Sequence, residues 1–229
     1  MTSDRETRAE AREGGGPKVS VKARRSRSAA QAEKRARILG AAREVFNRLG
    51  YDGASMNDIA TEAEVSKPTL YVYFTNKESL FAALIEDMMC ATPELALVLD
   101  AEAGDMLETL TRYGVNLTKK IIQPANIALF RLVIGAAGKF PAIGRMMFEA
   151  GPQKAVSRLT EYLCAQQAKG RLCVPDPELA AYQLLDLMQT RHLRRLVFNV
   201  AGMPSAADIE ASVASGVRLF VAAHAVPSR

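Results

Sequence analysis

The stretch that decides the fold is SMNDIATEAEVSKPTLYVYF, residues 55–74. It predicts two short helices joined by a tight turn. Ser55 followed three residues later by Asp58 is a capping-box pattern, which satisfies the first backbone N–H groups of a helix. Ser66 can cap the second helix, and Pro68 falls in its first turn, where proline is tolerated. The second helix is therefore expected to span barely two turns.

The second helix of this pair has two unlike faces. At 100° per residue, Leu70 and Phe74 lie about 40° apart, so they can anchor the helix on a core. The opposite side carries hydroxyl, phenol and small apolar groups, namely Pro68, Thr69, Tyr71, Val72 and Tyr73. Thymine methyls and base edges in a DNA major groove suit the small groups, and phosphates suit the phenols. The alternative is a helical hairpin whose tyrosines belong to a core.

Two lysines flank this face. Lys67 lies at the start of the second helix, where a basic side chain can reach a base edge or the DNA backbone. Lys77 opens the next helix, and its ammonium together with the first N–H groups of that helix would suit a phosphate. The helical pair with these lysines favours DNA binding.

The segment before the pair contains a basic tail and a helix. Apolar residues recur at helical spacing over about Gln31–Leu49, and Gly50 supplies a stop. Residues 1–30 mix charges without a period, so a disordered basic tail is predicted there. The last basic residues of this tail are Lys22, Arg24, Arg25 and Arg27. They could form an arm that touches DNA, or the tail could only aid solubility.

The remaining chain is predicted to be helical throughout. One helix begins near Asn76, and longer amphipathic helices follow Pro93. We expect them at Asp105–Ile122, Pro124–Gly138, Ile143–Glu149, Pro152–Lys169, Pro177–Val200 and Ser205–His224. No sustained alternation of apolar and polar residues indicates a strand. The predicted fold class is all-α, with a small N-terminal domain at 32–92 and a larger helical domain at 93–229.

The composition of the 229 residues limits the class of protein. Hydrophobic residues make up 48%, which predicts a globular chain, and the formal net charge of +5 fits an acidic partner or simply a basic protein. No apolar window reaches the about 18 residues of a membrane span, and no secretory signal is recognised. Cys90, Cys164 and Cys173 have no ligand spacing and suit a reducing cytoplasm. The last two are either incidental thiols or redox partners.

The sequence offers no catalytic or metal-binding constellation. The histidines are His192 and His224, with no Ser-His-acid arrangement, no phosphate-binding glycine loop and no metal spacing. We therefore expect no enzyme, no cofactor and no metal. The remaining rival to DNA binding is a helical adaptor that binds protein through the same short helix.

Residues Ala32 to Thr92 resemble the DNA-binding domain of TetR-type transcriptional regulators. The resemblance is carried by FNRLGY at 46–51, SMNDIA at 55–60, VSKPTLYVYF at 65–74 and NKESLF at 76–81. It implies an N-terminal three-helix helix-turn-helix domain and a homodimer whose C-terminal domain holds an effector pocket and the dimer interface. The stretches 131–141 and 148–152 look similar, more loosely, to the C-terminal domain of AefR-like members.

The resemblance also implies residue roles. The reading helix, capped by Ser66, would contact DNA through Lys67, Pro68, Thr69, Tyr71, Val72 and Tyr73. Ser55 and Lys77 would contact phosphates, and Asn57 matches a position that touches a base in some members. The implied function is sequence-specific regulation, most simply by a repressor that leaves a palindromic double-stranded operator when an unidentified small-molecule effector binds.

The chain departs from the family pattern at two positions. Family members usually have glycine at the position of Glu64. Many have glycine at that of Pro68, although proline is also used there. If Glu64 has a positive φ, its side chain costs on the order of 1 kcal/mol.

Three further expectations concern the C-terminal domain. An effector pocket could be lined by Tyr113, Leu117, Phe130, Ile134, Met147, Phe148 and Tyr162, although such side chains could equally be core. Two apolar stripes are expected to form the dimer interface unless they pack only within the subunit: Val213, Val217 and Phe220, and Leu184, Leu185, Met188 and Leu196. His192 among Arg191, Arg194 and Arg195 could bind an anionic effector or a partner's acids, or lie on a solvated helix face.

Overall fold

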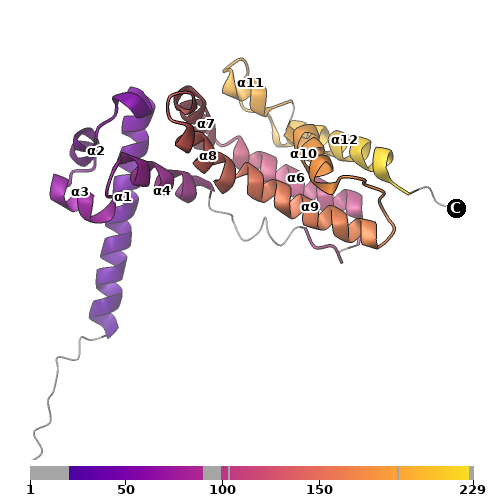
Figure 1. The fold of residues 1–229 in the computed structure, drawn as a ribbon, viewed down its shortest axis with the longest axis horizontal. Helices are drawn as coiled ribbons and strands as arrows, with labels where there is room; N and C mark the ends of the chain where they lie inside the picture. Colours follow the sequence, from indigo (N-terminus) through magenta and orange to yellow (C-terminus); the bar gives the residue numbers. More distant parts are fainter. Residues whose placement is uncertain (1–20, 90–98, 103, 190, 227–229) are drawn as a thin grey trace, which may run out of the picture. The chain divides into compact units, whose positions relative to one another are not determined.

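The computed structural model describes the backbone of residues 21–89, 99–102, 104–189 and 191–226, and their side chains except 21–27 and 89. Within these residues the chain folds into α-helices (Figure 1). The one strand-like pairing among them is an isolated bridge between Leu172 and Ala225. The predicted all-α fold is confirmed. Internal contacts divide the chain into two compact units between Arg37 and Ile38, and the residues of both hydrophobic cores belong to the second unit.

Helix α1 covers Val21–Gly53 and is interrupted at Gly50, whose φ of 71° and ψ of 170° are not helical. Glycine adopts a positive φ without strain, so the long helix stops where the sequence predicts. Its start at Val21 corrects the predicted disorder of residues 21–30, a segment rich in the helix-favouring residues Ala, Arg and Lys. The predicted disorder of residues 1–20, and the DNA contact of the tail, lie outside the described residues.

Three short helices follow α1, namely α2 (Met56–Glu62), α3 (Lys67–Tyr73) and α4 (Lys77–Met89). A serine caps each of the first two: the Oγ of Ser55 accepts from the backbone N–H of Asp58, and the Oγ of Ser66 accepts from that of Thr69. Each such cap stabilises a helix by about 1 kcal/mol. The two-helix prediction for residues 55–74 is confirmed.

The first hydrophobic core joins α1–α4 to two later helices, α7 (Pro124–Ala137) and α8 (Pro141–Ala150). Aromatic rings form one part of it. The ring centroid of Tyr51 lies 5.7 Å from that of Phe46, 5.1 Å from Phe81 and 5.0 Å from Phe140. The N-terminal helices therefore share their core with α7 and α8.

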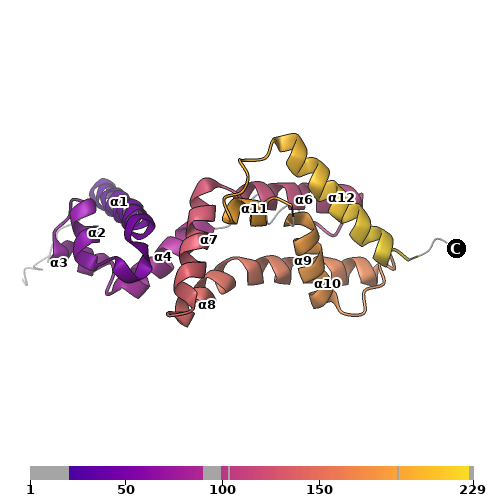
Figure 2. The ribbon, with the colours of Figure 1, turned by 90° about the horizontal axis from the view of Figure 1, so that it is seen from above.

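The second core is formed mainly by α6 (Met106–Ile121), α9 (Pro152–Ala168), α10 (Pro177–Gln189) and α12 (Ala206–His224), seen in Figure 2. Two glycines allow close helix crossings. A Cβ atom on Gly216 of α12 would lie 2.7 Å from the carbonyl oxygen of Leu187 on α10. One on Gly114 of α6 would lie 2.6 Å from the Cγ1 of Val213 on α12. Both crossings require the absence of a side chain.

The predicted single helix Pro177–Val200 is wrong, because α10 ends at Gln189 and a separate short helix, α11, covers Leu193–Val197. The break contains neither glycine nor proline. Arg131 of α7 donates hydrogen bonds to the carbonyl oxygens of Leu196 (2.6 Å) and Val197 (2.9 Å) at the end of α11. These two hydrogen bonds attach α11 to α7.

The two apolar stripes predicted as a dimer interface lie inside the subunit. Each of their residues is at most 9% exposed in the single chain: Leu184, Leu185, Met188, Leu196, Val213, Val217 and Phe220. They belong to the second core, because α6 and α9 cover the faces that carry them. This corrects the predicted interface. The large apolar residues that α10 and α12 leave exposed are Leu179, Tyr182 and Leu219.

Within the described ranges no single helix is long and apolar enough to cross a membrane. One pair, α6 and α7, meets the length and composition test together, with a bend of 70° between the two helices.

Candidate nucleic-acid interface

Helix α3 presents the two faces that its sequence predicts. Leu70 is fully buried and Phe74 is 5% exposed, so these two anchor the helix on the first core. On the other side Val72 is 83% exposed and Tyr71 is 43% exposed. Lys67 and Pro68 are exposed as well. Exposed apolar and aromatic side chains on so short a helix, here Val72 and Tyr71, are available to a binding partner.

Two members of the predicted reading face are held by the protein itself. The hydroxyl of Thr69 lies 2.8 Å from the Oγ of Ser66, so it is engaged at the cap and leaves its methyl group for an apolar contact. Tyr73 is half-buried and packs against the first core. Lys67, Pro68, Tyr71 and Val72 therefore form the open part of the face, with Thr69 and Tyr73 beside it.

The start of α2 is a complete capping box. Asp58 Oδ2 accepts from the backbone N–H of Ser55 at 3.0 Å and from its hydroxyl at 2.6 Å. These hydrogen bonds hold the pKa of Asp58 below its usual range, and the bond from the hydroxyl contributes most. Asn57 is exposed beside the cap. Both Ser55 and Asn57 thus lie on the surface at the start of α2.

Glu64, in the turn between α2 and α3, has a φ of 52°. The backbone N–H of Glu64 donates to the carbonyl oxygen of Thr61 (3.1 Å), and that of Val65 to Ala60 (3.0 Å). This pair of bonds is a Schellman motif, in which the left-handed residue is usually glycine. Glu64 thus meets the condition stated for it above, and a non-glycine residue costs on the order of 1–2 kcal/mol there.

The side chain of Lys77, predicted to contact a phosphate, binds backbone carbonyl groups of the protein itself. Its Nζ donates to the carbonyl oxygens of Tyr51 (2.8 Å), Ala54 (3.0 Å) and Asp52 (3.3 Å). It also lies 4.6 Å from the ring centroid of Tyr51. An ammonium has three N–H donors, so these carbonyls account for all of them. The side chain fastens the end of α1 to the start of α4.

The same end of α1 contacts the turn between α7 and α8, which sequence reasoning missed. Asp52 Oδ2 and Lys139 Nζ are 2.6 Å apart, and this hydrogen bond holds the pKa of Asp52 below its usual range. Phe140 packs edge-on against Tyr51, whose pKa burial raises to about 12. The adjacent sequence Lys139-Phe140-Pro141 offered no sign of this contact, because its partners lie far away along the chain.

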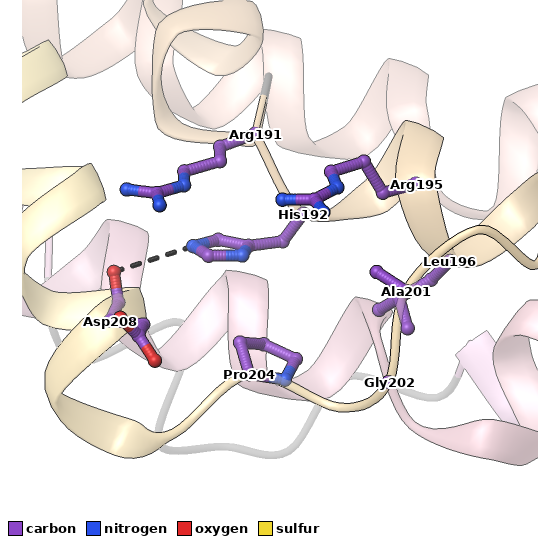
Figure 3. Close-up of a pocket in the computed structure, with 8 residues that line it drawn as sticks. All are labelled: Arg191, His192, Arg195, Leu196, Ala201, Gly202, Pro204 and Asp208. Atoms are coloured by element: carbon purple, nitrogen blue, oxygen red, sulfur yellow. Dashed lines mark hydrogen bonds between the residues drawn. The ribbon is translucent and has the colours of Figure 1, made fainter.

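A small cavity of about 220 Å³ lies at the start of α12, lined by Arg191, His192 and Arg195. Figure 3 draws the two arginines above the imidazole and Asp208 below it. His192 is 7% exposed, and its Nε2 is 3.3 Å from the backbone oxygen of Asp208. The hypothesis of a solvated face therefore fits Arg191, Arg194 and Arg195, which are exposed, and does not fit His192.

A larger cavity of about 280 Å³ lies among α6, α7, α9 and α10. It brings together Tyr113, Leu117 and Phe130 from the predicted pocket. The other candidates lie elsewhere: Met147 is in the first core, Tyr162 is buried in the second, and Ile134 and Phe148 are exposed. Sequence reasoning missed the charged lining residues Lys154 and Arg158, although their i, i+4 spacing places them on one face of α9.

The described part of the chain contains no cluster of three or more His, Cys, Asp or Glu side chains that could hold a metal ion. Cys164 and Cys173 are free, exposed thiols. Cys90 lies outside the described residues.

Two family profiles match the chain. The one described as "Bacterial regulatory proteins, tetR family" matches residues 38–84, which include α2, α3 and the first part of α4. The one described as "AefR-like transcriptional repressor, C-terminal domain" matches residues 108–226. The chain is a helix-turn-helix DNA-binding transcriptional regulator. It belongs to the TetR family, with a C-terminal domain of the AefR-like kind, and this family consists of regulators rather than enzymes.

The similar curated proteins are also helix-turn-helix transcriptional regulators. The chain is 28% identical to the transcriptional regulator UidR of Escherichia coli K12 over 194 residues, covering 82% of this chain and 90% of UidR. It is 38% identical to the transcriptional activator FasR of Mycolicibacterium smegmatis over 86 residues. That second match covers 38% of this chain and 36% of FasR.

Solved structures show the same fold over most of the chain. A TetR-family regulator from Mesorhizobium loti MAFF303099 superposes with a TM-score of 0.73 at 29% identity, covering 85% of this chain and 98% of that one. The flavonoid-responsive regulator FrrA superposes with a TM-score of 0.72 at 29% identity, covering 86% of this chain and all of FrrA.

Proposed function

We propose that this protein is a repressor that binds a palindromic operator as a homodimer and leaves it when a small molecule binds. The exposed face of α3 is the observation that carries the proposal. Leu70 and Phe74 hold the helix in place, and the opposite face presents side chains that match a major groove. The AefR-like repressor profile over residues 108–226 supports the direction of regulation.

The side chains of α3 divide between base reading and backbone binding. Pro68, Val72 and the methyl group of Thr69 suit thymine methyls, and Lys67 and the phenols of Tyr71 and Tyr73 suit phosphates or base edges. Ser55, Asn57 and Ser66 lie at the exposed starts of α2 and α3, where backbone N–H groups favour an anion. Lys77 is assigned to hold the helices together, since its ammonium is already bonded to carbonyl groups.

The dimer would form through exposed parts of α10 and α12. These helices cross closely at Gly216 and expose Leu179, Tyr182 and Leu219. A two-fold axis there would place two α3 helices against successive major grooves, about 34–36 Å apart.

The effector would occupy the cavity among α6, α7, α9 and α10. Helix α7 gives Asn126 and Phe130 to this cavity, while its Leu129 and Val133 lie in the core shared with α1–α4. A ligand that moves α7 therefore acts directly on the DNA-binding helices. Release requires that the effector bind the DNA-free form more tightly than the operator-bound form. The similarity to flavonoid-responsive FrrA supports a small organic effector, and a repressor of this kind acts on DNA in the cytoplasm.

Gel-shift and fluorescence-anisotropy titrations with the DNA upstream of the protein's own gene test this function. The logarithm of the binding constant should fall linearly with the logarithm of the salt concentration, with a slope of about 0.9 per phosphate contacted. Lys67→Met should weaken binding and reduce that slope by about 1. Lys119→Met removes an exposed lysine of α6 and should change neither quantity.

A salt-independent interaction would contradict operator binding and favour the protein-adaptor alternative. Loss of binding in Lys119→Met to the same degree as in Lys67→Met would show that net charge, and not the α3 face, governs the interaction.

A further inference from the structure

The cavity among α6, α7, α9 and α10 has a lining set by helical spacing. Tyr113 and Leu117 lie one turn apart on α6, and Asn126 and Phe130 one turn apart on α7. Tyr182 and Leu185 of α10 close another side. Aromatic and aliphatic groups thus dominate the walls, which is typical of sites for small organic molecules.

One side of this cavity is cationic. Lys154 and Arg158 lie one turn apart on α9 and both line it. Arg158 is half-buried. Burial raises the pKa of the Tyr113 phenol to about 12, and the nearby positive charge of Arg158 opposes this rise by a smaller amount. Throughout the described residues no carboxylate lies within ion-pair distance of either cation.

The other charged lining residues do not cancel this excess. Lys120 and Asp186 also line the cavity, and each has interactions of its own. The four charged groups sum to three cations against one anion, a formal charge of +2. Removing water from a half-buried guanidinium that has no carboxylate partner costs free energy. An uncharged ligand in the cavity would displace that water without offering Arg158 an opposite charge.

We propose that the effector is an apolar carboxylate whose acid group binds to Arg158, with Lys154 beside it, and whose body lies against Leu117, Phe130 and Leu185. This inference rests on the proposed use of the cavity as the effector site. Guanidinium groups bind carboxylates through two parallel hydrogen bonds, which fixes the orientation of the ligand as well as its charge. The cavity of about 280 Å³ limits the apolar body to a short chain or a fused ring pair.

Titration calorimetry on the full-length protein without DNA tests the proposal. Calorimetry is chosen because the chain has no tryptophan to report binding by fluorescence. The probes are two isosteric sets that differ in one group: decanoate, 1-decanol and decylamine, and 2-naphthoate, 2-naphthalenemethanol and 2-naphthylmethylamine. At least one acid should bind about tenfold or more tightly than its alcohol, and the amines should bind more weakly still.

Variants locate the acid group. Arg158→Met should weaken binding of the acid about tenfold or more and leave binding of its alcohol unchanged, whereas Arg158→Lys should retain part of the acid binding. Arg145→Met, on the exposed side of α8, is the matched control and should bind like the unaltered protein. Circular dichroism melting of each variant confirms that it is folded.

Several outcomes would overturn the proposal: no binding of either acid, an alcohol or amine that binds as tightly as its acid, or full acid binding by Arg158→Met. Because these titrations contain no DNA, they are independent of operator release. An acid that binds through Arg158 but does not release the operator would overturn the release mechanism and leave the ligand assignment in place.

Discussion

At the scale of single residues, Lys77 shows how a side chain's partners decide its role. The sequence predicts that it contacts a phosphate, since it opens a helix next to the reading helix. Its ammonium instead binds the carbonyl oxygens of Tyr51, Asp52 and Ala54, which lie more than twenty residues earlier. These carbonyls lie in the last turn of α1 and directly after it, at the negative end of a helix dipole, so a cation is favoured there.

We expect Lys77→Met to destabilise the protein rather than only weaken its binding to DNA. The substitution leaves partly buried carbonyl groups without donors, which should cost about 2 kcal/mol or more. Chemical denaturation monitored by circular dichroism measures this change in the free energy of unfolding. Lys67→Met is the control. Because Lys67 is exposed, its replacement should weaken DNA binding but change the free energy of unfolding by no more than about 0.5 kcal/mol. Equal stability of the two variants would restore the phosphate role to Lys77.

At the scale of helices, local patterns were sufficient where local chemistry decides. The caps Ser55 and Ser66, the stop at Gly50 and the buried pair Leu70 and Phe74 all follow from spacing of a few residues. These features fixed the reading helix and the side it exposes. The glycine usual at the position of Glu64 in the family pointed to the turn residue whose φ is positive.

Patterns failed where distant contacts decide. The break after α10 has no glycine or proline, and the helix that follows it is bonded to Arg131 of α7, a residue more than sixty positions earlier in the chain. An apolar stripe does not reveal whether a neighbouring helix or a second subunit covers it, so the stripe containing Val213 and Val217 was assigned to the wrong surface. Pocket residues could not be separated from core residues for the same reason, as Met147 and Tyr162 show.

The turn between α2 and α3 should become more stable when Glu64 is replaced by glycine. Glycine removes the about 1–2 kcal/mol of left-handed strain but costs about 0.5–1 kcal/mol of backbone entropy, so a net gain of about 0.5–1 kcal/mol is expected. For a chain of this size that corresponds to a rise of about 1–4 °C in Tm. Differential scanning calorimetry measures it.

Glu64→Ala provides the control for this turn, because alanine removes the charge and keeps the strain. A rise in Tm for the alanine variant as large as that for glycine would mean that the carboxylate at the end of α2, and not the φ angle, is the destabilising feature.

At the scale of the whole molecule, the dimer is the assembly on which operator spacing depends. Leu219 of α12 is 61% exposed on a helix that otherwise buries its large apolar residues. We expect Leu219→Arg to give a monomer at micromolar concentration and to weaken binding to a full palindrome far more than to a half-site. Sedimentation velocity and anisotropy measure the two effects.

The matched control for the dimer prediction is Ile134→Arg, which places the same charge on an exposed position of α7. A dimer that persists in Leu219→Arg would move the subunit contact to another surface. Dissociation of the Ile134→Arg variant would do the same.

The core that joins α1–α4 to α7 and α8 has a consequence for how such regulators can be recombined. A chimaera cut near residue 92 and fused to a foreign effector domain would lose Val133 and Ile143 from the first core, and Phe140 from its contact with Tyr51. The new domain would have to supply matching side chains at those points. The portable unit of this protein is therefore the set of DNA-binding helices together with α7 and α8, although these two are separated from the others along the chain by all of α6.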